Sequence, residues 1–205
     1  MFVFDVSDTE PKEGAPSLPR EVAQPFEVRG GRVGRELNQT IENAKRDGVE
    51  VIQREARSQS AGMIQPTQRR GLLSITIREL PRIERLEVPL RYEVLLSSKL
   101  SAEARYATLV HELAHLYCGH LGTPNQGWWP DRRGLLKEVR EFQAESVCYL
   151  VCRRLGIDNP SDEYLSNYVK VHEETPEISL DRVMTATGLI EQMGRERLKP
   201  RKGGA

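Results

Sequence analysis

Residues 108–120 read TLVHELAHLYCGH, so three histidines and one glutamate interrupt a largely apolar run. His111 and His115 are four positions apart, which places them on one face of a helix, about 40° apart around its axis. Two imidazoles in this arrangement can bind one Zn²⁺ ion. Glu112 points about 100° away from His111 and can reach a water molecule on the metal. We interpret this stretch as a metal site; the alternative is a pair of hydrogen-bonded core histidines beside an ion-paired glutamate.

The predicted helix around this motif runs from Ala102 to about Leu121 and follows a predicted strand at residues 92–96. Ser101 is a good N-cap residue, and Glu103 places a negative charge in the first turn, where the helix dipole favours it. Apolar residues occupy almost every side of this helix, which predicts that it is buried. Because a buried charge without a partner is costly, the histidines and the glutamate of the motif need polar partners.

A catalytic zinc site needs a third protein ligand and leaves one position for water. The extended pattern HExxHxxGxxH would supply a third histidine, with glycine at position 118 and histidine at position 121. Here these positions are Cys118 and Leu121, and His120 is out of phase with the pattern. A carboxylate on a following helix is the other way to complete such a site.

The segment LLKEVREFQAESVCYLVCRRL, residues 135–155, predicts that second helix. Metal-binding residue types recur along it at spacings of three and four and form one stripe, namely Glu138, Glu141, Glu145, Cys148 and Cys152. Acidic residues in so apolar a helix indicate a buried site. Helical phase cannot choose among the three glutamates, since all face the same way. Thiolate ligation is conceivable, but free cysteine more often packs as a small hydrophobic residue.

Together, HELAH and the later Glu-Phe-Gln-Ala-Glu at 141–145 resemble the HExxH…ExxA(D/N/E) arrangement of gluzincin-type metallopeptidases. More narrowly, TLVHELAHLYCGH with REFQAESVCYLVCRRLGI is similar to ImmA/IrrE-type zinc metallopeptidases and to the metallopeptidase domain of ArdC-like antirestriction proteins. The resemblance covers roughly residues 92–170. It implies that His111, His115 and Glu141 bind Zn²⁺ and that Glu112 is the general base. Glu145 stands where many relatives have Asp or Asn, which implies a hydrogen-bond acceptor behind a ligand.

The resemblance also implies a zincin-like fold and a zinc-dependent endopeptidase. The expected substrate is a specific protein, such as a DNA-binding repressor in a stress or mobile-element response. The alternative is an antirestriction or DNA-associated module in which the zinc site is structural or regulatory. A peptidase of this type commonly needs a second electrophile. The sequence offers five candidates without ranking them, namely Tyr106, His120, Tyr149, Tyr168 and His172.

We expect one α+β domain with three regions along the chain: an N-terminal strand and helix region at 1–91, a zincin-like core at 92–194, and a basic flexible tail at 195–205. The first region predicts strands at 2–6, 49–52 and 72–77, a helix at 35–47 ended by Gly48, and a loop at 56–71. A strand directly after Met1 favours the hypothesis that the start is truncated. For the tail, contact with nucleic acid is the alternative to a solvated end.

Two helices should follow the metal-binding pair, one from Ser161 to about His172 and one capped by Ser179. Trp128 and Trp129 lie in the loop between the two metal-binding helices. As exposed rings they can line a substrate cleft, and as packed rings they cover the edge of the site.

Composition and charge fit a globular protein, which we expect to be cytoplasmic. The 205 residues include 30 Lys and Arg and 30 Asp and Glu, so the formal net charge is zero. This balance excludes a globally basic nucleic-acid binder, although it allows a local basic patch. The sequence contains no apolar run of about 18 residues, and its first ten residues lack signal-peptide features. Three cysteines are an odd number, which argues against a disulfide framework.

Overall fold

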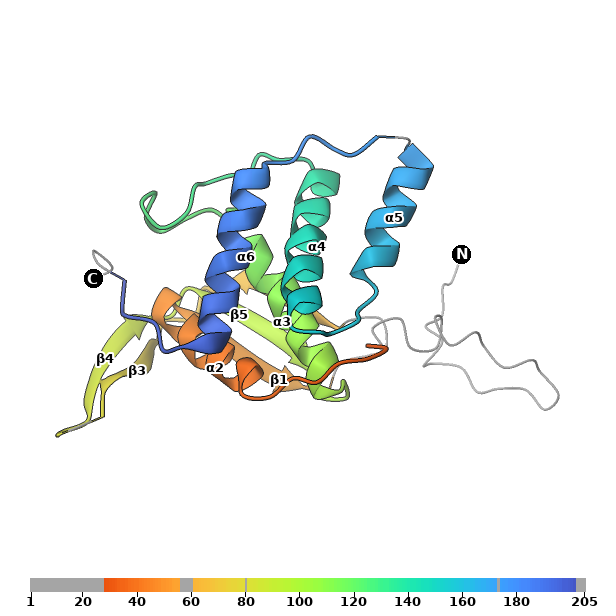
Figure 1. Ribbon diagram of the computed structural model, residues 1–205. Coiled ribbons are helices and arrows are strands. Elements are labelled where there is room, and N and C mark those ends of the chain that lie inside the picture. Colours follow the sequence, from red (N-terminus) through yellow and green to blue (C-terminus); the bar gives the residue numbers. More distant parts are fainter. Residues whose placement is uncertain (1–27, 56–60, 80, 173, 202–205) are drawn as a thin grey trace.

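Helices cover one face of a small mixed sheet, and a second, two-stranded sheet projects to one side (Figure 1). The computed structural model describes residues 28–55, 61–79, 81–172 and 174–201. The predicted strand at 2–6 lies outside the described residues. In the part of the chain that is described, every helix is too short or too polar to cross a lipid bilayer. The arrangement is α+β, as the sequence predicted.

The mixed sheet has β5 (Tyr92–Ser97) at its centre and β1 (Val49–Arg54) and β2 (Gly62–Pro66) at its edges. β1 runs parallel to β5, and β2 runs antiparallel to it, with Ile64 opposite Val94. Five of the six residues of β5 are buried, so this strand anchors the sheet to the core. Such an apolar strand, covered by its neighbours, is typical of a central position.

The segment before β1 agrees with the predicted helix and its stop. α2 (Glu36–Ala44) continues into a 3-10 turn, η2 (Lys45–Asp47), and Gly48 follows with a left-handed φ of 81°. A Cβ atom on Gly48 would meet the carbonyl oxygen of Pro89 at 2.5 Å, so both the backbone angle and the space require glycine there.

The prediction of a loop over residues 56–71 was wrong for its central part, because residues 62–66 form β2. The strand is short, begins with Gly62 and ends with Pro66, and neither residue is typical of a strand interior. Both are tolerated because β2 is an edge strand. β4 (Glu84–Pro89) also pairs with β3 (Leu72–Arg78), although it is rich in charged residues.

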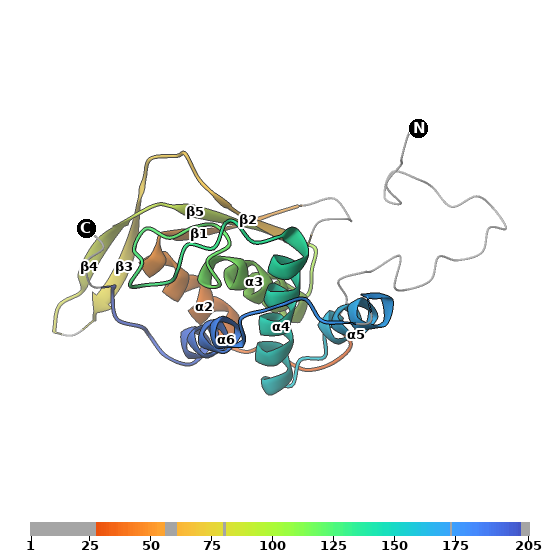
Figure 2. The same cartoon turned by 90° about the horizontal axis from the view of Figure 1, so that it is seen from above.

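The helical half consists of α3 (Ala102–Tyr117), α4 (Lys137–Arg154), α5 (Ser161–His172) and α6 (Leu180–Arg195). Figures 1 and 2 show α4 between α5 and α6, and α3 between α4 and the mixed sheet. The Ser101 hydroxyl accepts the Ala104 N–H at 3.1 Å and so caps α3. The interface of α3, α4 and α6 forms the centre of the core, with Leu109, Leu113, Leu116, Val147, Val151, Ile190 and Met193 buried.

Asp47 is fully buried and joins the last described residues to the body. Its carboxylate accepts hydrogen bonds from the hydroxyl of Tyr117 at 2.9 Å and from Nε of Arg201 at 2.7 Å. Nε of Arg46 lies 3.3 Å from the same carboxylate. Leu198 and Arg201 therefore contact the body of the protein, whereas Glu196, Arg197 and Lys199 are exposed. The sequence predicted a basic, flexible tail at 195–205.

We expect Asp47→Ala to lower the free energy of unfolding by about 3–5 kcal/mol, because it leaves two arginines near a buried site without their carboxylate. Thermal or denaturant unfolding measures the change. Glu42→Ala is the matched control, since Glu42 forms an exposed ion pair with Lys45 in the same part of the chain and should matter little. Equal effects of the two substitutions would show that the buried cluster does not stabilise the fold.

Candidate metal centre

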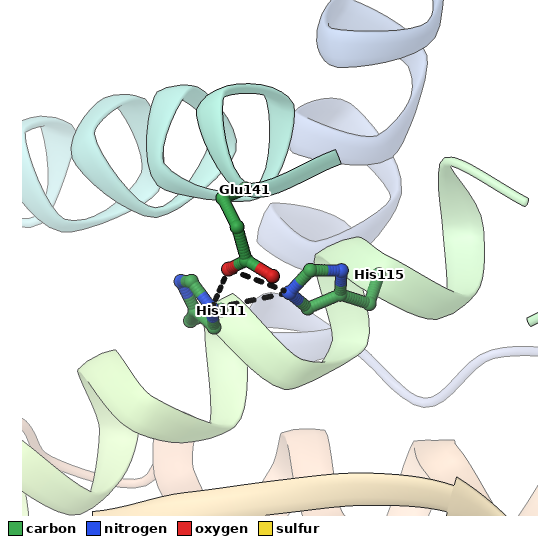
Figure 3. A group of neighbouring side chains, drawn as sticks. All are labelled: His111, His115 and Glu141. Carbon is green, nitrogen blue, oxygen red and sulfur yellow. Dashed lines mark hydrogen bonds and ion pairs between the residues drawn. The ribbon is translucent and has the colours of Figure 1, made fainter. Parts of the chain in front are cut away.

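His111, His115 and Glu141 converge where α3 crosses α4 (Figure 3). Nε2 of His111 lies 3.2 Å from Nε2 of His115. Glu141 Oε2 lies 3.7 Å from the first of these nitrogens and 3.5 Å from the second. One atom from each residue can therefore contact the same ion.

This donor set fits a metal ion. Two imidazoles and one carboxylate form a known type of catalytic zinc site, in which the fourth position is left for water or substrate. The three side chains are only partly buried, with 21% of His111, 14% of His115 and 32% of Glu141 exposed. Each of the three side chains therefore keeps some contact with solvent.

The other nitrogen of His111 has its own partner. His111 Nδ1 lies 3.3 Å from Oε1 of Glu145, one helical turn beyond Glu141 on α4. The second oxygen of Glu145 accepts a hydrogen bond from the hydroxyl of Ser161 at 2.6 Å, and Asn159 donates to that hydroxyl at 2.8 Å. Glu145 thus occupies the position from which a carboxylate orients a metal-binding histidine.

The Nδ1 atom of His115, which is not one of the three clustered donor atoms, lies 3.0 Å from Nδ1 of His120. His120 reaches this position because α3 ends at Tyr117 and Gly119 turns the chain with a φ of 85°. Nε2 of His120 in turn lies 2.9 Å from Oε1 of Gln143. Burial lowers the pKa of His120 to about 4. The sequence pattern excluded His120 as a third ligand, but it missed this contact.

Glu112 points away from the metal donors and is buried, as its place in the helix predicts. Its Oε2 accepts the backbone N–H of Ile64 on β2 at 2.8 Å. Burial raises the pKa of Glu112, although the nearby histidines and this hydrogen bond oppose the shift. A raised pKa brings a carboxylate closer to the range in which it exchanges protons at neutral pH.

The pKa values of His111, Glu141 and Glu145 are set mainly by burial and by their mutual contacts. Burial lowers the pKa of His111, but the hydrogen bond with Glu145 and the surrounding carboxylates outweigh it and raise the pKa. The hydrogen bond with His115 lowers the pKa of Glu141. At Glu145, burial by itself would raise the pKa, but the contacts with His111 and Ser161 outweigh it and lower the pKa. Both of these glutamates are therefore favoured as carboxylates.

A cavity of about 420 Å³ opens beside His111 and Glu112. Small and apolar residues form much of its wall, namely Val28, Ala61, Gly62, Ala104, Ala107 and Thr108. Its polar part consists of Glu145, Cys148, Asn159, Ser161 and Tyr164. The cavity thus adjoins one of the three metal-binding side chains, His111, and can receive part of a ligand. Neither tryptophan lines it, and Trp129 is buried with its indole N–H donated to the Gly122 carbonyl at 2.8 Å.

The five predicted candidates for a second electrophile do not line this cavity. Tyr106 is buried with its hydroxyl near Gly194 of α6, and Tyr168 stacks on His172 with ring centroids 4.2 Å apart. Tyr164 lines the cavity instead. Burial and the charges of two nearby glutamates raise its pKa. Tyr164 belongs to the helix predicted from Ser161 to about His172, and no sequence motif singles it out.

The other members of the predicted stripe on α4 have different surroundings. Glu138 lies in the first turn of the helix and is exposed. Cys148 is buried, and its thiol lies 3.3 Å from the Ala107 carbonyl oxygen. Cys118 lies outside this stripe, at the end of α3, and burial raises the pKa of its thiol to about 12, which disfavours the thiolate needed for metal binding. Among the described residues, the group able to hold a metal contains no cysteine.

No protein-family model matches this chain, and neither a curated protein nor a solved structure matches it. The α+β arrangement and the group of His111, His115 and Glu141 are observed directly in the structure. The zincin-like fold, zinc as the metal and peptidase activity rest on the motif residues and on the geometry of the site, and they are proposals.

We expect Glu141→Ala to cut zinc affinity severely, because it removes one of three donor atoms. Glu145→Ala should weaken binding by about 10–100-fold, since it removes only the group that orients His111. Glu138→Ala is the control on the same helix and should leave affinity unchanged. Competition with a zinc chelator measures all three. Equal losses from Glu141→Ala and Glu145→Ala, or a larger loss from Glu145→Ala, would move the ligand one turn along α4.

Proposed function

We propose that this protein is a zinc-dependent endopeptidase, with His111, His115 and Glu141 as zinc ligands and Glu112 as general base. One observation carries the proposal: three partly exposed side chains each bring one donor atom to the same point, and a separate buried carboxylate, that of Glu112, lies on the helix of the two histidines without joining the group. A site that only stores or binds a metal does not need this separate carboxylate. A hydrolytic site does, because a base must take a proton from the attacking water.

The roles of the chain's own residues follow from their contacts. Zinc, when bound, would lower the pKa of its water toward about 7 and polarise the scissile carbonyl. Ile64 holds one oxygen of Glu112, so the other oxygen remains available for a proton. Glu112 would accept the proton of the attacking water and then donate it to the leaving amine. β2 thereby positions the base relative to α3.

The cavity supports a substrate side chain as its occupant. Its small and apolar wall lies next to Glu112 and His111, where the atoms flanking a scissile bond would be held. The resemblance of the motifs supports a specific protein substrate, such as a DNA-binding repressor. Narrow specificity is expected on the same grounds, so generic peptides need not be cleaved.

A structural zinc site is the competing proposal, as in an antirestriction or DNA-associated module. Closed structural sites use four protein ligands. The nearest further candidates, Glu145 and His120, contact the Nδ1 atoms of the two histidines and so lie behind the ligands. Among the described residues, the group has three donors, which favours a site with an open position.

We expect Glu112→Gln to abolish hydrolysis while keeping about one zinc per chain, because Glu112 accepts protons and is not a ligand. Metal analysis of the purified proteins measures zinc, and cleavage of a protein substrate measures activity. Glu138→Gln is the control, since it removes an exposed carboxylate from the same half of the protein and should change neither. Loss of zinc from Glu112→Gln would show that the division of roles is wrong.

We expect Tyr164→Phe to lower kcat by about 10²–10³-fold with little change in zinc content, if its hydroxyl stabilises the oxyanion as a second donor. Tyr168→Phe is the matched control on the same helix, because Tyr168 packs against Phe142 and His172 and does not line the cavity. Steady-state kinetics separates kcat from KM. An unchanged kcat in Tyr164→Phe would remove this residue from the reaction.

A further inference from the structure

We propose that two copies of this protein associate through the two-stranded sheet, by antiparallel pairing of the β4 strand of one copy with the β4 strand of the other. This sheet consists of β3 and β4 and extends away from the helices (Figures 1 and 2). Among the described residues, β4 has β3 as its one neighbour, so the outer edge of β4 is open. The proposal goes beyond the proposed function and does not depend on the metal site.

The two-stranded sheet exposes apolar side chains toward its free end. Ile75 and Val88 are buried against the body of the protein, whereas Leu86, directly opposite Ile75, is 40% exposed. Ile77 is also exposed, and Ile83, just before β4, is 65% exposed. A pair of strands has little stability of its own in water, and exposed apolar residues gathered on one are typical of a contact surface.

The open edge belongs to β4 because β3 lies nearer the body. Ile75, Thr76 and Ile77 of β3 share a small cavity with Arg46 of η2 and with Leu198. Every residue of β4 except Val88 is exposed. A second chain can therefore reach β4 without displacing another part of the protein that the structure describes.

The hydrogen bonds between β3 and β4 determine which residues of β4 face outward. The Leu90 N–H donates to the Gly71 carbonyl at 2.9 Å, so these two residues form a hydrogen-bonded pair. Such pairs recur at every second residue of an antiparallel ladder, so Leu86 also bonds to β3. The backbone N–H and C=O groups of Arg85 and Glu87, which alternate with these residues, therefore point to the open edge.

Charge selects one way of pairing two such edges. Three symmetric registers keep the outward residues near the two-fold axis: Arg85 opposite Arg85, Glu87 opposite Glu87, or Arg85 opposite Glu87 of the second copy. The first two place like charges directly opposite each other, which is destabilising. The third gives two pairs of opposite charge. Within the described part of the chain, neither side chain already has an ion-pair or hydrogen-bond partner.

The third register also suits the backbone and the apolar residues. Each Arg85–Glu87 pair exchanges both of its backbone hydrogen bonds, because both residues have outward-facing groups. Leu86 comes to lie beside Leu86 of the second copy, on the apolar face of the combined sheet. Ile83 lies opposite Pro89 of the second copy, and the ladder ends there because proline has no N–H.

Charged residues and a proline on an edge strand also discourage unspecific strand pairing. On β4 they leave one favourable register with a second copy, which is how repulsive elements create specificity. A contact of one strand pair belongs to the small, transient class of interfaces, which bury less than about 1,200 Å². We therefore expect a dimer that forms as the protein concentration is raised and dissociates on dilution.

The first experiment maps the register in the full chain by disulfide formation. Leu86→Cys should place each new thiol opposite its own copy, with the Cα atoms about 4.5 Å apart and within disulfide reach. In a glutathione redox buffer we expect Leu86→Cys to give a covalent dimer, and Arg85→Cys and Glu87→Cys to give far less. The native cysteines are buried, so the unsubstituted protein is the control. Preferential cross-linking at position 85 or 87, or none at the three positions, would overturn the proposal.

The second experiment measures the dissociation constant by sedimentation equilibrium. Arg85→Glu and Glu87→Arg should each raise it by about 10-fold or more, because each places like charges opposite each other twice. The double variant Arg85→Glu/Glu87→Arg should restore the value of the unsubstituted protein. Arg54→Glu is the matched control, since it reverses an exposed charge on β1, an edge strand of the other sheet, and should have no effect.

A mixture of the two single variants provides a further check, because Arg85→Glu and Glu87→Arg should associate with each other more tightly than either does with itself. Three results would overturn the proposal: an unsubstituted protein that stays monomeric up to about 1 mM, equal effects of Arg85→Glu and Arg54→Glu, or a double variant as weak as the single ones. All these substitutions are at exposed positions, and unchanged melting temperatures would show that the variants fold.

Discussion

The site depends on one constraint: α3 brings three ionisable side chains into a largely apolar helix, and each must find a polar partner. The partners come from separate parts of the chain. Glu145 on α4 faces His111, His120 after α3 faces His115, and the backbone of β2 donates to Glu112. The three donor atoms are left facing one another. The relative positions of α3, α4 and β2 are thereby tied to the chemistry of the site.

Close packing holds these elements at the required distances. A Cβ atom on Gly62 would lie 2.5 Å from the Thr108 side chain and 2.9 Å from the Leu95 carbonyl oxygen. β2 can therefore approach both α3 and β5 only with glycine at this position. A Cβ atom on Gly119 would likewise meet the Pro130 carbonyl oxygen at 2.1 Å. The first glycine brings the backbone donor of β2 to Glu112, and the second turns His120 back onto His115.

The sequence predicted what depends on local spacing and missed what depends on tertiary packing. The positions of His111 and His115 on one helical face follow from their spacing alone. The same rule could not separate Glu138 from Glu141, because both lie on one stripe. The crossing of α3 and α4 separates them, since it places Glu141 at the histidines and leaves Glu138 exposed. β2 was missed because its glycine and proline carry a weak strand signal, and only its pairing with β5 defines it.

The two sides of the metal-binding histidines contact different groups. The Nε2 atoms of the two histidines face Glu141 on one side, whereas their Nδ1 atoms face Glu145 and His120 on the other. Because every buried group of the motif already has a protein partner, the fold does not need the ion to offset a buried charge. Small zinc domains differ in this respect, since the metal supplies much of their folding free energy. An ion that is not required for folding can be held with one position open, which is the arrangement that hydrolysis needs.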